Sequence, residues 1–184
     1  WQMQSDSWKS TCDKRPSDPF ICSLDSPRHE EIYRWFTCDK VLADPNFVTG
    51  GKSVTTDEYT EAHGGIGICY ETGQATDTSR VDEVIKDILN LMSDLKLIEH
   101  KKTQSHSSKK EIFELVDSII VTADGFRFAE GWGNQSWEPF RAGDVIGYHG
   151  DQALRMNYEG MTVFPHSPIN RPEGSRVACL ARKV

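Results

Sequence analysis

Long apolar runs are absent from this sequence of 184 residues. No stretch approaches the roughly 18 consecutive apolar residues that a transmembrane helix needs. The segment from Trp1 to Lys14 lacks the basic and then apolar layout of a secretory signal, so we expect a cytoplasmic protein with no membrane partner. The formal net charge is −7, and the lysines and arginines are too scattered to neutralise a phosphate backbone. We therefore expect no nucleic-acid partner.

Compact catalytic motifs are absent as well. The sequence contains no HExxH or HxxE pair of zinc ligands, no GxSxG serine motif and no Walker phosphate loop. Its five cysteines are odd in number and show no CxxC spacing, which argues against a disulfide framework and against a cysteine zinc site. We expect them to be reduced thiols. The six histidines occur singly, and only His63 is close in sequence to a candidate catalytic residue, Glu71.

The hydrophobic pattern changes its period along the chain and predicts an α/β fold class with two units. Hydrophobic residues make up 37% and charged residues 27%, as in a globular protein. Residues 1–100 are expected to form a truncated α/β domain, 101–110 a polar linker, and 111–184 a small all-β module. In the first part we expect a strand at 20–22, helices at 28–40 and 55–62, and a buried strand at 66–70. In the β module, β-prone runs occur at 112–122, 126–129, 144–148, 161–164 and 177–180.

A long amphipathic helix is predicted to begin near Ser79. Ser79 and Asp82, three residues apart, indicate a capping box. Seven apolar residues then recur at helical spacing: Val81, Val84, Ile85, Ile88, Leu91, Met92 and Leu95. We expect this apolar face to pack on a sheet, a burial worth on the order of 10 kcal/mol before chain entropy is subtracted.

The expected strand at 66–70 runs into this helix through the polar turn Glu71-Thr72-Gly73. A strand followed by a helix is half of a βαβ unit, and ligands of open α/β sheets bind at the carboxyl ends of the strands. Glu71 would stand at that end, with Gly73 allowing a substrate or metal to approach closely. The residues leave two interpretations of Glu71: a general base, or an ordinary solvated carboxylate at a strand end.

Three runs of residues point to a known family. The run GICYETGQ at 67–74 contains a strand that ends in Glu-Thr-Gly, the run at 140–183 contains Arg-Ala-Gly-Asp-Val-Ile-Gly and a later Phe-Pro, and WKSTCDKRPSDPFIC at 8–22 ends near Pro-Phe. In this order they resemble the succinylglutamate desuccinylase/aspartoacylase family, zinc-dependent deacylases related to the zinc carboxypeptidases. The likeness covers most of residues 8–184.

The resemblance implies a fold, a substrate class and a catalytic residue. It implies a partial zinc-carboxypeptidase-like α/β sheet unit followed by a small all-β barrel or sandwich-hybrid module. It also implies hydrolysis of N-acyl amino acids, with zinc as the cofactor and Glu71 as the catalytic base that takes the proton of a zinc-bound water. The matching residues correspond to the C-terminal portion of the family.

The resemblance fails at the zinc ligands of the family. Where the family has a zinc-ligating histidine this chain has Lys9, and the aspartate two places earlier is Ser7. An ammonium group has no lone pair with which to ligate a metal. The His-x-x-Glu ligands of the family precede this segment, so we expect no metal ligand and no cofactor within the chain. We expect the chain by itself to be inactive, because a lone carboxylate base supplies only about 10²–10⁴-fold acceleration.

Two alternatives remain open. The chain can be a non-catalytic binding or oligomerisation module derived from the family, or a separate chain can supply the zinc ligands and complete the site. A truncated sheet would also expose a strand edge, and exposed edges pair with other chains. We therefore expect a homo-oligomer, and a small-molecule N-acyl amino acid as the partner if the site is complete.

Overall fold

The computed structural model describes residues 17–45, 55–74, 77–99 and 109–184. These residues fall into two units. The α/β unit comprises Asp18–Gly73 and Asp77–Glu114, and the β unit comprises mainly Leu115–Lys183. The division falls within strand β4 (Glu111–Ile120), whose first residues belong to the α/β unit and whose remainder belongs to the β unit. Each unit has its own hydrophobic core.

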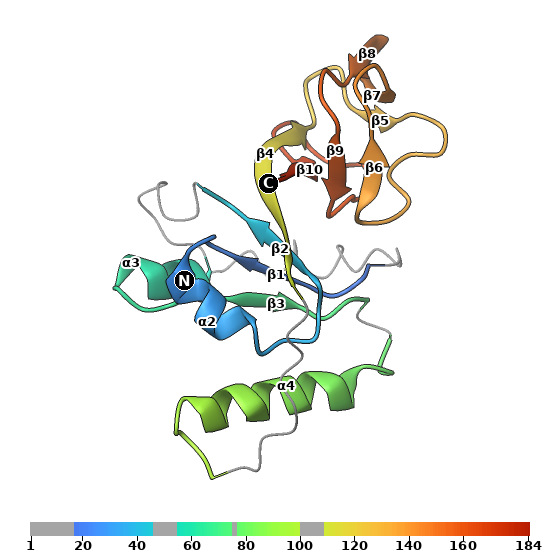
Figure 1. Cartoon of the computed structure of the whole chain (residues 1–184). Coiled ribbons are helices and arrows are strands. Elements are labelled where there is room, and N and C mark those ends of the chain that lie inside the picture. Colours follow the sequence, from blue (N-terminus) through green and yellow to red (C-terminus); the bar gives the residue numbers. More distant parts are fainter. Residues whose placement is uncertain (1–16, 46–54, 75–76, 100–108) are drawn as a thin grey trace, which may run out of the picture. The chain divides into compact units, whose positions relative to one another are not determined.

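Parallel strands form the centre of the α/β unit (Figure 1). Strand β1 (Phe20–Ser23) is parallel to β2 (Lys40–Ala43), and β2 is parallel to the first part of β4. Strand β3 (Cys69–Glu71) is antiparallel to β1, so the strand order in this unit is β3-β1-β2-β4. The sequence pattern predicts β1 but not β2, a short apolar run. The predicted α/β class is confirmed.

Helix α2 (Pro27–Tyr33) connects β1 to β2. The predicted helix at 28–40 is therefore too long. The chain leaves the helix after Tyr33, where the backbone N–H groups of Trp35 and Phe36 donate to carbonyls three residues back and that of Thr37 donates to the carboxylate of Asp87 (2.8 Å). Three aromatic side chains of this segment are buried: Tyr33, Trp35 and Phe36.

Helix α3 (Thr56–Ala62) confirms the helix predicted at 55–62. It begins with a capping box, in which the side chains of Thr55 and Glu58 each accept a hydrogen bond from the backbone N–H of the other. Among the helices that the structure describes, none is both long enough and apolar enough to cross a bilayer.

Helix α4 (Val81–Asp94) begins differently from the prediction. Arg80 occupies the position before the first helical residue and its side chain makes no capping hydrogen bond. The backbone N–H of Ser79 donates to Asp77 (2.9 Å) in the turn that precedes the helix. The predicted capping box of Ser79 and Asp82 is therefore wrong, because the helix starts one residue later than that box requires.

The burial of α4 differs from the prediction, although Leu91 packs on the core of the α/β unit. Its buried residues are polar, Asp87 and Asn90. Four of the seven apolar residues assigned to a sheet contact have 42–50% of their surface exposed: Val81, Ile85, Ile88 and Leu95. The inward side of the helix carries a carboxylate that binds the chain after α2. Burial of the whole apolar face is therefore a wrong prediction.

Short strands build the β unit around a core that includes Phe140, Ile146 and Val177. One strand order is β4-β10-β9-β6 and a second is β5-β7-β8. The strands are β5 (Arg127–Phe128), β6 (Glu138–Phe140), β7 (Val145–His149), β8 (Gln152–Arg155), β9 (Gly160–Val163) and β10 (Arg176–Lys183). The five predicted runs are confirmed as strands, whereas the pattern does not predict β6 and β8. In neither group does the last strand pair with the first, so no closed barrel occurs among the described strands. The barrel or sandwich-hybrid form stays a prediction.

Candidate functional site

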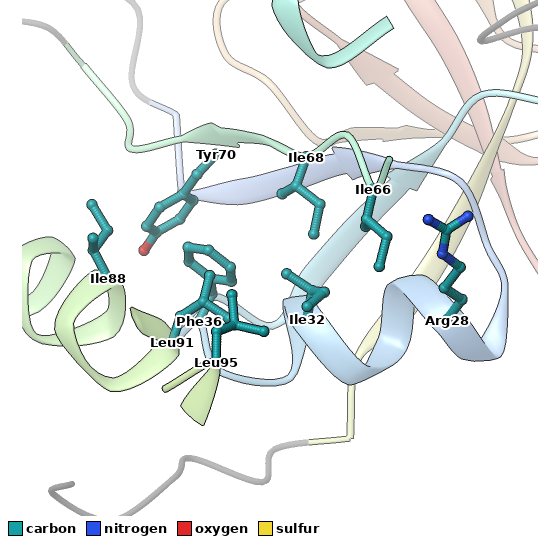
Figure 2. Close-up of a pocket in the computed structure, with 9 residues that line it drawn as sticks. All are labelled: Arg28, Ile32, Phe36, Ile66, Ile68, Tyr70, Ile88, Leu91 and Leu95. Carbon is teal, nitrogen blue, oxygen red and sulfur yellow. The ribbon is translucent and has the colours of Figure 1, made fainter. Parts of the chain in front are cut away.

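Glu71 is the last residue of β3, which is an edge strand in the part of the sheet that the structure describes. The strand covers only Cys69–Glu71 and its residues are half-buried, so the buried strand predicted at 66–70 is wrong in its bounds and in its burial. Side chains alternate along a strand, which puts Ile68 and Tyr70 on one face and Cys69 and Glu71 on the other. Figure 2 shows Ile68 and Tyr70 pointing toward α2 and α4. Glu71 therefore lies on the face turned away from these two helices.

The carboxylate of Glu71 is bound by its own strand. The Sγ atom of Cys69 donates a hydrogen bond to Oε1 of Glu71 over 3.4 Å. Burial, and next the negative charge of Glu71, raise the pKa of the Cys69 thiol to about 12. The thiol is therefore protonated at neutral pH and remains a donor. Across the strand pair, Glu71 lies opposite the fully buried Phe20.

The pairing of β3 corrects the predicted location of Glu71 in the sheet. Because β3 is antiparallel to β1, Glu71 pairs with Phe20, the first residue of β1, and Phe20 pairs with Lys40, the first residue of β2. Glu71 therefore lies at the amino ends of the parallel strands and not at the carboxyl ends, where ligands of open α/β sheets bind. For the same reason β3 and α4 are not half of a parallel βαβ unit. The catalytic role of Glu71 stays a prediction that rests on the family resemblance.

A cavity of about 610 Å³ lies on the other face of β3 within the α/β unit (Figure 2). Besides Arg28 and Tyr70, its lining is aliphatic or aromatic: Ile32, Phe36, Ile66, Ile68, Ile88, Leu91 and Leu95. The guanidinium of Arg28 donates to the carbonyl oxygen of Gly64 (2.6 Å). Such a lining suits an apolar group better than a charged N-acyl amino acid. Glu71 and this cavity are on opposite faces of the strand.

A polar cluster joins α4 to the chain after α2. The carboxylate of Asp87, 2% exposed, accepts hydrogen bonds from the backbone N–H (2.8 Å) and the hydroxyl (2.7 Å) of Thr37. The hydroxyl of Thr37 also lies 2.7 Å from Glu83, and that of Tyr70 lies 3.5 Å from Asp87. Burial is the main cause that raises the pKa of Tyr70. The polar atoms of the cluster bind one another, so its role is to hold α4.

A second polar cluster joins α2 to α3. His29, 3% exposed, lies with Nδ1 2.7 Å from the Ser26 hydroxyl and with Nε2 2.6 Å from Oε1 of Glu61. The same carboxylate oxygen accepts the backbone N–H of Gly67 (2.5 Å). Burial raises the pKa of Glu61, but the hydrogen bonds from Gly67 and His29 outweigh it and lower the pKa below its usual value. The sequence gives no signal for this cluster, because His29 and Glu61 are 32 residues apart.

Replacing Glu61 by Gln is expected to lower the free energy of unfolding by about 1 kcal/mol at neutral pH, because donors bind a charged acceptor more strongly than an amide. The pKa of folded Glu61 is lowered, so its contribution is complete above the ordinary value of 4.5 and is lost as the pH falls through the lowered value. The difference between wild type and E61Q should therefore shrink in acid. Urea unfolding at neutral pH and at about pH 3 measures it, and a difference that grows in acid would contradict this assignment.

The other residues singled out in the sequence do not assemble around Glu71. His63 ends α3, where its ring stacks on Tyr59 and its Nδ1 lies 2.8 Å from the carbonyl oxygen of Tyr59. Ser7 and Lys9 lie outside the described residues. Within the described ranges, no group of three or more histidine, cysteine, aspartate or glutamate side chains is arranged to hold a metal ion. These residues alone do not fit the zinc site of the family.

The chain matches known proteins in its fold and not in its sequence. No protein-family profile and no curated protein sequence matches the chain. A succinylglutamate desuccinylase from Vibrio cholerae superposes with a TM-score of 0.69 at 19% sequence identity, over 90% of this chain and 49% of that chain. This chain has the fold of about half of a desuccinylase.

Two further structures agree. A succinylglutamate desuccinylase/aspartoacylase from Rhodobacter sphaeroides gives a TM-score of 0.62 at 17% identity, over 92% of this chain and 55% of that chain. An aspartoacylase family protein from Mesorhizobium loti gives a TM-score of 0.58 at 19% identity, over 91% of this chain and 58% of that chain. The chain thus spans about half the length of the structures that it matches. The fold expected from the resemblance is confirmed as a part of the desuccinylase fold.

Proposed function

We propose that this chain is the C-terminal portion of a succinylglutamate desuccinylase/aspartoacylase-like hydrolase, and that Glu71 is the general base for cleaving the amide bond of an N-acyl amino acid. The observation that carries the proposal is the place of Glu71 in a desuccinylase-type fold: it ends β3, and a polar turn and then α4 follow. Glu71 is half-buried, and its carboxylate accepts a hydrogen bond from the Cys69 thiol, which holds it in one place on the strand.

The proposal assigns no zinc ligand to this chain. The described donors do not fit a zinc site, and Lys9 replaces the histidine expected from the family. What Glu71 can do without further groups is accept a proton, which is worth about 10²–10⁴-fold in rate and is far less than amide hydrolysis needs. The complete reaction therefore requires metal ligands from another polypeptide or from sequence beyond this chain.

The experiment is a zinc titration followed by an activity assay. Purified chain is incubated with zinc, freed of unbound metal and analysed for bound zinc, and then assayed with N-succinylglutamate and N-acetylaspartate. We expect less than stoichiometric zinc and no hydrolysis above that of the E71Q variant. Stoichiometric zinc together with hydrolysis that E71Q abolishes would show that the chain holds a complete site, and would overturn the assignment of inactivity. Hydrolysis that E71Q retains would contradict the role of Glu71.

The second proposal is an assembly function, which a separate observation favours. Helix α4 exposes four large apolar side chains beside a cavity whose lining includes Tyr70 of β3, the edge strand of the described sheet. A soluble monomer rarely exposes a contiguous apolar surface of this kind next to an open sheet edge. We propose that a second copy of the chain covers this surface in a homo-oligomer.

A further inference from the structure

Two cysteines face each other across β1 and β3. Cys22 is the direct partner of Cys69 in the antiparallel register. Side chains of directly opposed residues lie on one face of a sheet with Cβ atoms about 4.5–5.5 Å apart, and a disulfide spans a Cβ separation of about 3.5–4.5 Å. Both residues are half-buried, and neither is in a disulfide. A shift of roughly 1 Å by the short strand β3 brings the two sulfurs within bonding distance.

The other described cysteines occupy different surroundings. Cys179 on β10 pairs with Val163 in the β unit. Cys38 packs in the core of the α/β unit, and burial raises the pKa of its thiol to about 11. Among the cysteines that the structure describes, the directly opposed pair is therefore that of Cys22 and Cys69.

The Cys69 thiol also has a base in contact with it. Oε1 of Glu71 accepts its hydrogen bond at 3.4 Å. A thiol must lose its proton before its sulfur can attack another sulfur. Burial and the negative charge of Glu71 hold the pKa of Cys69 near 12, so the thiol needs a base in contact with it to take the proton during the attack.

We propose that Cys22 and Cys69 form a reversible disulfide when a peroxide is present, with Glu71 as the base that serves Cys69. Peroxide first oxidises the Cys22 thiol to a sulfenic acid and leaves as water. The sulfur of Cys69 then attacks the sulfur of Cys22, so that the S–S bond forms and the S–O bond breaks. The thiol proton passes to Glu71 and from there to the departing hydroxide, which leaves as a second water. Two thiols lose two electrons, and one peroxide is reduced to two water molecules.

The disulfide changes β3 in two ways. It attaches an edge strand covalently to β1, so that β3 can no longer separate from the sheet without breaking a bond. It also removes the thiol that binds Glu71 in the reduced chain. The chemistry of the pair is independent of the proposed amide hydrolysis, because neither zinc nor an acyl substrate takes part.

The test uses the full chain, first reduced and then treated with hydrogen peroxide, after which free thiols are blocked with iodoacetamide. Mass spectrometry of the digest is expected to show one disulfide that joins the peptides carrying Cys22 and Cys69, and its reversal by dithiothreitol. C22S and C69S should each abolish the cross-link, while the buried-cysteine variant C38S should keep it. E71Q should form the cross-link several-fold more slowly, because its amide takes no proton.

Three results would overturn the proposal. The first is alkylation of both Cys22 and Cys69 after peroxide treatment, and the second is pairing of either residue with Cys12 in place of the other. The third is an unchanged rate in E71Q, which would remove Glu71 from the mechanism. A thermal melt of each variant, expected to show a higher Tm for oxidised than for reduced wild type and no such rise in C69S, ties the cross-link to the folded chain. Since none of these measurements uses hydrolysis, their failure and failure of the hydrolase proposal are separate outcomes.

Discussion

Replacing Asp87 by Ala is expected to lower the free energy of unfolding by about 3 kcal/mol. Asp87 is 2% exposed and accepts both the backbone N–H and the hydroxyl of Thr37. Its removal leaves that N–H without an acceptor, while the hydroxyl of Thr37 can still donate a hydrogen bond to Glu83 (2.7 Å). It also weakens the attachment of α4 to the chain after α2, because the contacts that remain there are those of Glu83 and Asp94 nearer the helix ends. Denaturant unfolding of D87A against wild type measures the loss.

Two further variants separate the hydrogen bonds from a general effect on α4. D87N keeps an acceptor oxygen for Thr37 and is expected to lose only about half as much as D87A. D94A removes a carboxylate from the same helix that is 28% exposed and accepts the indole N–H of Trp35 (3.1 Å), and we expect a loss of about 1 kcal/mol. If D87A costs no more than D94A, the cluster around Asp87 does not hold the helix in place.

The same residue explains why the sequence predicts α4 correctly as a helix and wrongly as a buried apolar surface. Apolar spacing indicates a helix because every member of the stripe, from Val81 to Leu95, falls on one side of a 3.6-residue period. It does not say which side meets the rest of the chain. Here the inward side is chosen by Asp87 and its partner Thr37, which are 50 residues apart in sequence. No local pattern contains that information.

Strand β3 shows a related limit. The run from Ile66 to Tyr70 predicts a buried strand, and β3 overlaps the end of that run. Its direction in the sheet depends on pairing with β1, which is distant in sequence, and that direction puts Glu71 at the amino ends of the parallel strands. The family motif identifies Glu71 directly. The expectation that Glu71 lies at the carboxyl ends of parallel strands selects the same residue, but β3 is antiparallel to β1.

Two of the strands that the sequence pattern does not predict, β2 and β6, are short and pair with strands that are distant in sequence. β2 is a run of four residues that pairs with β1 on one side and β4 on the other, and its burial follows from that central position. β6 is shorter still and owes its register to β9. By contrast, β4 and β10 are long enough for their own composition to indicate a strand.

A chain carrying both Ile85→Glu and Ile88→Glu is expected to be monomeric, whereas the wild-type chain is expected to be a dimer or a larger oligomer at micromolar concentration. Ile85 is 50% and Ile88 is 42% exposed on α4, and Ile88 also lines the cavity beside β3. Burial of the two side chains by a second copy is worth about 2–4 kcal/mol per subunit, and a carboxylate placed there adds the cost of its desolvation. The dissociation constant should therefore rise by at least about 10³-fold.

Sedimentation velocity of both proteins, over a concentration series, measures this change. The matched control is Ile169→Glu, which makes the same replacement at a residue of the β unit that is 75% exposed, and which should leave the oligomer intact. Circular dichroism of the double variant should equal that of wild type, because the two side chains contribute little to the core of their own unit. A wild-type chain that sediments as a monomer at micromolar concentration would show that the apolar face of α4 and the edge of β3 are not covered by a second copy.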